Sequence, residues 1–246
     1  MIRRLATSFA LAAGIAFAAG ATAAQAGSEN GNFMVRLQGT YLSTSDNTKS
    51  LFLDNADVTG AYKGETPNLV LPTATLTYFF NKNFAAELFC CFAKTDVDIF
   101  TGAGAKVGNA AETWMFPPIV TLQYHFTGLG AIKPYVGAGV QYIHYFSSKT
   151  GDNVLNAQGV KFGDSFGPAI QAGFDMSLGG GWYLNADVKK SWLDTKITWS
   201  NGTVPAAFNT LTAKHDLDPV TISVGVGYRF NLEDLFGGRR SYEPMK

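Results

Sequence analysis

The chain of 246 residues contains little cysteine and no excess of charge of either sign. Its two cysteines, Cys90 and Cys91, are adjacent, whereas a disulfide framework uses separated cysteines. Neighbouring residues on a strand point to opposite faces, so we expect no disulfide here. Because no histidine or further cysteine lies near them, we also predict no metal site and no cofactor. Nineteen basic residues balance nineteen acidic ones, which disfavours a nucleic-acid partner because that would require a basic face.

Long apolar runs are also absent after the first 26 residues. No later stretch approaches the ~18 apolar residues expected of a membrane-spanning helix. At the start, Arg3 and Arg4 precede an apolar run over 5–19, and small residues lead to Ala26. This layout is typical of a secretory signal peptide. We predict one at residues 1–26, with cleavage after Ala23 as an alternative. A membrane anchor is disfavoured because the run is shorter than the ~20 residues of a span.

The rest of the chain alternates apolar and polar residues with a period of two. The segments are 33–41, 70–80, 84–98, 120–126, 136–142, 170–176, 182–189 and 220–230. A soluble sheet with one wet face would alternate in the same way. A membrane barrel does so because its apolar face meets lipid and its polar face lines the lumen. The export signal and the aromatic residues at strand ends, such as Tyr78-Phe79-Phe80, favour the barrel.

The links between these segments alternate in length. Short links are predicted at 81–83, 127–133 and 179–181, and long links at 44–68, 99–113, 147–165 and 200–214. Short periplasmic turns and long extracellular loops are typical of outer-membrane barrels. We therefore predict an all-β fold, an eight-stranded antiparallel transmembrane β-barrel over 27–230. The remaining 231–246 would be a periplasmic C-terminal tail, either without fixed structure or in contact with the barrel rim.

Charged residues fall on the predicted inner face of this barrel. They are Arg36, Glu87, Asp175, Asp187, Lys189 and Arg229. Eight strands leave a lumen only wide enough for side chains or one small ligand, and charges in such a space must be paired. Two interpretations stay open together: a structural plug of salt bridges, and a polar barrier beneath a hydrophobic antechamber from which a ligand leaves sideways.

The three histidines offer little support for catalysis. His144 lies near Ser147 and Ser148, but strand pairing indicates no acidic partner, and a catalytic triad needs one. His125 is expected at a strand end facing the lumen or the interface, and His215 at a loop edge. We therefore predict no catalytic residue and no enzyme. A lipid-modifying enzyme using His144 is the least favoured alternative.

Four motifs in order carry a family resemblance. They are PPIVTLQYHF at 117–126, KPYVGAGV at 133–140, DSFGPAIQAG at 164–173, and LDP at 217–219 leading to GVGYRF at 225–230. Together they resemble the outer-membrane protein W (OmpW) family. The resemblance implies an eight-stranded barrel in the outer membrane of a Gram-negative bacterium, with a narrow hydrophobic channel. Its partners would be outer-membrane lipids and small hydrophobic solutes, which it would take up passively.

The resemblance also assigns roles to individual residues. The family's constriction matches Leu69 or Leu71 together with Phe166, which would form the channel gate. Tyr228 and Phe230 end the last strand, where the outer-membrane assembly machinery reads an aromatic signal, although residues follow Phe230 here. The predicted function is therefore passive transport of small hydrophobic molecules. The alternative is a structural or adhesive barrel with a plugged lumen.

Overall fold

The computed structural model describes residues 31–45, 47–204 and 206–231. The predicted signal peptide and residues 232–246 of the predicted tail lie outside this range. Within it, no helix is long and apolar enough to cross a membrane.

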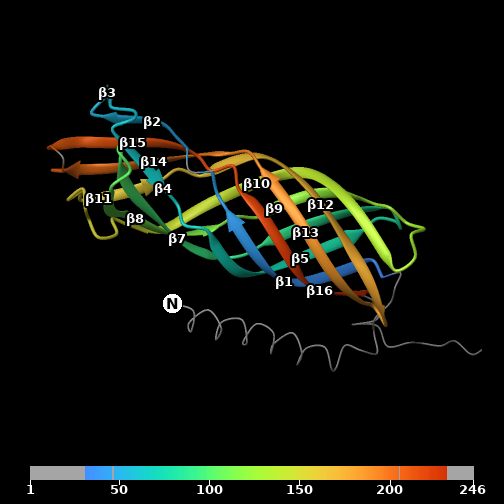
Figure 1. The fold of residues 1–246 in the computed structure, drawn as a ribbon. Coiled ribbons are helices and arrows are strands. Elements are labelled where there is room, and N and C mark those ends of the chain that lie inside the picture. Colours follow the sequence, from blue (N-terminus) through green and yellow to red (C-terminus); the bar gives the residue numbers. More distant parts are fainter. Residues whose placement is uncertain (1–30, 46, 205, 232–246) are drawn as a thin grey trace, which may run out of the picture.

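Eight of the strands form a closed antiparallel barrel (Figure 1). In order around the wall these are β1 (Phe33–Ser43), β5 (Leu69–Phe79), β6 (Phe84–Cys90), β9 (Ile119–His125), β10 (Ile132–Lys149), β12 (Ser165–Gly179), β13 (Trp182–Ser191) and β16 (Val220–Phe230). β1 pairs with β16 from Phe33↔Phe230 to Ser43↔Val220, which closes the wall. The predicted eight-stranded barrel is confirmed, and closure leaves no unpaired edge in the hydrocarbon.

The period-two pattern separates the two faces of the wall. On β1, Val35 and Leu37 are exposed on the outside, whereas Arg36 and Gln38 are buried inside. A slip of one residue in the pairing would exchange these faces, so the pattern fixes the register. The outer face forms an apolar belt for lipid.

One end of the barrel has short turns and an aromatic border. Asn81 Oδ1 accepts hydrogen bonds from the backbone N–H groups of Asn83 and Phe84, which closes the first turn. Tyr78 packs edge-on against Phe80 with ring centroids 5.2 Å apart. Such a girdle is typical of a membrane interface, and it marks the predicted periplasmic rim.

The long links at the other end contain further strands. These are β2 (Asn47–Leu53), β3 (Ala56–Asp57), β4 (Tyr62–Glu65), β7 (Ala93–Thr101), β8 (Lys106–Phe116), β11 (Gly159–Phe162), β14 (Asp194–Gly202) and β15 (Phe208–Asp216). β7 and β8 pair with each other and β8 pairs with the far part of β10, while β11, β14, β15, β2 and β3 form a second sheet. The sequence pattern had suggested loops over 44–68, 99–113, 147–165 and 200–214, and it had joined residues 93–98 of β7 to the barrel strand that begins at Phe84. Figure 1 shows instead that these strands, with the far part of β10, form an ordered structure beyond the barrel, which we call the extension.

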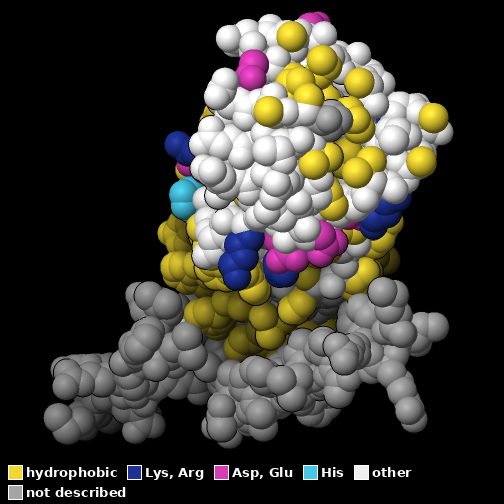
Figure 2. All heavy atoms as spheres, turned by 90° about the vertical axis from the view of Figure 1, so that its left-hand side faces the viewer, with side chains coloured by type: hydrophobic (Ala, Val, Ile, Leu, Met, Phe, Trp, Pro, Cys, Tyr) yellow, Lys and Arg dark blue, Asp and Glu magenta, His cyan; other side chains and the backbone are white. Residues whose placement is uncertain are grey.

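Apolar side chains from the β7–β8 pair and from the second sheet pack together and hold the extension in place. Trp199 is buried in a cluster with Val97, Ala111 and Leu155. Its Nε1 donates to Ala110 O at 2.9 Å, so the indole also has its polar partner. Figure 2 shows the extension end-on: hydrophobic side chains gather on it, and charged side chains lie between it and the apolar wall of the barrel.

Candidate functional site: an apolar chamber above a charged plug

Arg36 lies at the centre of the barrel interior and is fully buried. Its Nε and one terminal nitrogen contact both oxygens of Asp175, at 3.0 and 2.6 Å. The other terminal nitrogen contacts Glu87 Oε2 at 2.8 Å and Thr77 Oγ1 at 2.5 Å. This two-point contact with Asp175 is the strong geometry of an arginine–carboxylate pair. The guanidinium thus joins β1, β5, β6 and β12 across the lumen.

Lys189 supplies the second buried cation. Its Nζ lies 3.1 Å from Glu87 Oε1 and also contacts Asp187. Gln171 Nε2 donates to Glu87 Oε1 and to Asp187 Oδ2, at 2.9 Å each. Tyr135 Oη donates to Asp187 Oδ2 at 3.0 Å. Because the carboxylates share their partners, these side chains form one continuous network.

Arg229 lies apart from this network. Its Nε donates to Gly31 O at 2.6 Å, and its guanidinium carbon lies 3.7 Å from the centroid of the Phe79 ring. The structure therefore places all six sequence-predicted charges inside the wall, three cations with three carboxylates. Glycine makes room for one of these side chains, because a Cβ on Gly227 would lie 3.1 Å from Arg36 Cγ. We call the network of Arg36, Glu87, Asp175, Asp187 and Lys189 the plug.

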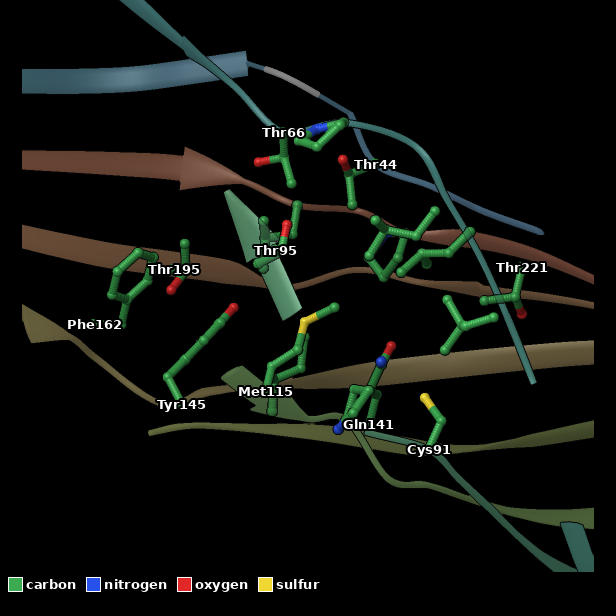
Figure 3. A pocket seen from close by; sticks show the side chains of 18 of the residues that line it. Thr44, Thr66, Cys91, Thr95, Met115, Gln141, Tyr145, Phe162, Thr195 and Thr221 are labelled. Atoms are coloured by element: carbon green, nitrogen blue, oxygen red, sulfur yellow. The ribbon is translucent and has the colours of Figure 1, made fainter. Parts of the chain in front are cut away.

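A cavity of about 60 Å³ lies between the plug and the extension, and we call it the inner chamber (Figure 3). Leu69 and Leu71, two residues of the predicted gate, line it together with Phe89, Met115 and Ile143. Phe89 separates it from the plug, because Lys189 Nζ lies 5.0 Å from the centroid of that ring. No Lys, Arg, Asp or Glu is among the residues lining this chamber.

A second cavity of about 140 Å³ lies inside the extension, and we call it the outer cavity. Val97 and His215 line both cavities, so the two spaces adjoin. Val107 and Val204 also line the outer cavity and are each 42% exposed, so its outer end meets solvent. The sequence pattern did not indicate this cavity, because most of its walls come from segments expected to be loops.

Phe166 does not join Leu69 and Leu71. Its side chain is 68% exposed on the outside of β12 and is not part of either cavity lining. The alternation explains this position, since its neighbours Ser165 and Gly167 are the buried residues of that strand. The structure thus brings together two of the three residues of the predicted gate.

His215 has a more central place than the expected loop edge. It is buried where the cavities meet, its Nδ1 lies 3.3 Å from Thr48 Oγ1, and its ring edge covers Gly64. Burial lowers its pKa to about 4, so the ring is neutral at neutral pH. The alternation Leu211, Ala213, His215 is the sequence signal that could have revealed its inward direction.

His144 has an acidic partner that strand pairing alone did not reveal. Asp164 accepts from Tyr142 Oη at 2.6 Å, and its other carboxylate oxygen lies 3.1 Å from His144 Nδ1. The pair is exposed on the outer rim. Ser148 instead contacts Thr113 Oγ1 at 3.0 Å, and no serine–His144 hydrogen bond occurs among the described residues. A nucleophile and base are therefore not brought together here.

The remaining candidates are simpler. His125 is buried at the end of β9, where its Nε2 lies 2.9 Å from Gln123 Oε1. Cys90 and Cys91 are free thiols. Across the described part of the chain, no group of three His, Cys, Asp or Glu side chains could hold a metal ion.

Comparison with known proteins agrees with this architecture. The model of the OmpW family matches residues 29–230. The chain is 37% identical over 163 residues to the uncharacterized outer-membrane protein y4mB of Sinorhizobium fredii, covering 65% of this chain and 66% of that one. It is 32% identical over 178 residues to the outer membrane protein AlkL of Ectopseudomonas oleovorans, covering 72% and 71%. The chain thus spans about two thirds of the length of these relatives.

Solved structures give the same result. The crystal structure of OprG from Pseudomonas aeruginosa superposes with a TM-score of 0.75 at 28% identity, covering 83% of this chain and 98% of that one. The AlkL structure in lipid bilayers has a TM-score of 0.62 at 24% identity, covering 84% and 93%, and supports the fold. With the family model matching most of its length, the chain belongs to the OmpW family of Gram-negative outer-membrane β-barrel proteins.

Proposed function

We propose that this protein is a passive channel that takes small hydrophobic molecules through the extension to the inner chamber. One observation carries the proposal: two apolar cavities adjoin at Val97 and His215, and the outer one opens to solvent. An apolar solute gains free energy by leaving water for such a space. No energy source or catalytic step is required for this movement.

The plug defines what this channel excludes. Its charges occupy the lumen below the chamber and pair with one another, and we propose that this layer is the barrier to water and ions. A hydrophobic solute in the chamber would therefore leave sideways through the wall into the bilayer. In this proposal the plug is both a structural core and a barrier.

The names of two relatives agree with a hydrophobic solute. The proteins PahQ of Pseudomonas aeruginosa and DoxH of a Pseudomonas strain are each named as dibenzothiophene metabolism operon proteins. Each is 30% identical over 131 residues, covering 53% of this chain and 58% of the relative. Dibenzothiophene is a neutral aromatic molecule, and such a molecule gains free energy by moving from water into an apolar cavity.

The test compares two substitutions on β5, one that fills the chamber and a matched one on the outer face of the same strand. Leu71 lines the chamber, whereas its neighbour Val70 is exposed on the outer face. We expect Leu71→Trp to lower uptake of the hydrophobic dye N-phenyl-1-naphthylamine to the level of cells without the protein, because the indole occupies the space. Val70→Trp should take up dye like the wild type.

Barrel levels in the outer membrane, measured by heat-modifiable gel mobility, would be matched before the rates are compared. Equal dye uptake by wild-type cells and cells without the protein would overturn the transport proposal. Unchanged uptake by Leu71→Trp would overturn the route through the chamber. The first result would favour the structural or adhesive alternative, for which the plugged lumen is the supporting observation.

A further inference from the structure

The inner chamber contains polar atoms that the protein itself does not satisfy. Gln141 Oε1, Thr95 Oγ1 and Thr221 Oγ1 are buried, and no hydrogen-bond partner for them is found among the described residues. The three residues are only 4, 6 and 6% exposed, and all three line the chamber. Buried polar atoms in folded proteins nearly always have a partner. These three therefore point to a ligand that supplies one.

Other hydroxyl groups of the same chamber are satisfied. Thr40 Oγ1 lies 2.7 Å from Thr73 Oγ1 and 2.8 Å from Ser223 Oγ. The lack of a partner is thus not a general property of the hydroxyl groups in this lining. Figure 3 shows the Gln141 side chain reaching from β10 toward the middle of the chamber, with Thr221 and Thr95 on other strands around it.

The electrostatics of the chamber restrict the kind of group that it can accept. Its lining carries no charged side chain, and His215 is neutral at neutral pH because burial lowers its pKa to about 4. Lys189 lies behind Phe89 and is already engaged by Glu87 and Asp187. A carboxylate would lose its water without gaining a counter-ion. A neutral hydroxyl group can both donate to Gln141 Oε1 and accept from a threonine.

We propose that the inner chamber binds neutral amphiphiles, apolar molecules that carry one hydroxyl group such as phenols and alkanols, with the hydroxyl at Gln141 and Thr221. The apolar body would lie against Leu71, Met115 and Ile143. Its far end would pass Val97 into the larger outer cavity. The inference rests on the proposed channel function and names its preferred solute class.

The experiment compares 1-naphthol with naphthalene, which have the same ring system and differ by one hydroxyl group. The full-length protein in lipid nanodiscs carries 13C-methyl methionine, so that the Met115 signal reports occupancy of the chamber. We expect 1-naphthol to bind about tenfold more tightly than naphthalene once both are corrected for partition into lipid, since one added hydrogen bond has that effect.

The variants assign the preference to individual atoms. Gln141→Leu removes the amide at nearly constant volume and should reduce the preference to about one, and Thr221→Val should reduce it in part. Gln158→Leu is the control, because Gln158 is exposed in the extension and contacts Asn201. It should keep the wild-type preference.

Each outcome has a distinct meaning. Equal binding of the two solutes, or a preference that survives Gln141→Leu, overturns this inference and leaves the proposed channel standing. Equal binding would show that water alone satisfies the polar atoms, and a surviving preference would show that another group recognises the hydroxyl. A Met115 signal that responds to neither solute overturns both the inference and the route through the chamber.

Discussion

Arg36 shows how a single side chain shapes the interior of this barrel. Its guanidinium satisfies two carboxylates and a threonine hydroxyl from three other strands. A buried ion pair contributes little net stability relative to apolar packing, but removing one partner leaves the other charges buried and unpaired. The inward direction of Arg36 follows from the alternation of the sequence. Its partners do not, because they come from positions up to 139 residues away.

We expect Arg36→Met to lower the free energy of unfolding by about 3–5 kcal/mol, the usual cost of breaking a buried pair. Urea unfolding in lipid vesicles would measure it. Lys49→Met is the matched control, because Lys49 contacts Asp194 and Asp216 with its side chain half exposed, and exposed pairs contribute little. Equal effects of the two substitutions would show that the plug does not stabilise the barrel.

β15 shows how an element expected to be a loop becomes a wall of a cavity. It pairs with β14 on one side and β2 on the other, with His215 opposite Thr195 and Thr48. Its apolar residues Leu211 and Ala213 are buried in the core of the extension. A polar surface loop would leave these residues in water. Burial of this face therefore explains why the extension is ordered.

The burial of His215 predicts a pH dependence of this element. The pKa of His215 is about 4 when the ring is buried and 6.5 when it is exposed to water. An extension that has opened and exposed the ring therefore binds the proton more readily than the closed one. The extension is fully stable above pH 6.5 and loses stability as the pH falls from 6.5 to 4. The total loss is about 3 kcal/mol.

Hydrogen exchange of the β15 and β2 amides at pH 7 and pH 4.5, corrected for intrinsic exchange, measures this loss. His215→Gln keeps a polar side chain but cannot titrate in this range. We expect the variant to show no such loss between the two pH values. A wild-type extension that is equally protected at both pH values would contradict the burial of a neutral His215.

At the scale of the whole molecule, the closure of β1 onto β16 completes the fold. The contact joins the first and last strands of the barrel, and Phe33 stacks with Phe230 with ring centroids 6.1 Å apart. The barrel therefore cannot close until its last strand is in place. We propose that Tyr228 and Phe230 of this strand carry the signal read by the assembly machinery.

This proposal predicts that Phe230→Ala slows barrel assembly in cells, measured as the time for pulse-labelled protein to become heat-modifiable in the outer membrane. Phe80→Ala is the control, because Phe80 is an exposed aromatic residue of the same rim but does not belong to the last strand. Equal delays in the two variants would assign the effect to the aromatic girdle and not to a terminal signal.

The sequence by itself determined the class of this protein. Its period-two alternation fixes which residues meet lipid and which face inward, because a strand has only two faces. It therefore predicted the eight barrel strands and the inner position of Arg36, Glu87 and Lys189. Alternating link lengths placed the short turns at one end.

Only the tertiary structure decided what lies inside the barrel. Contacts across the lumen join strands distant in sequence, so alternation cannot show that Glu87 contacts both Arg36 and Lys189. Long links become ordered strands only because they bury one another's apolar faces, which created the outer cavity and enclosed His215. Inward direction is a property of one strand, whereas a cavity and its unpartnered atoms are properties of all the strands that surround it.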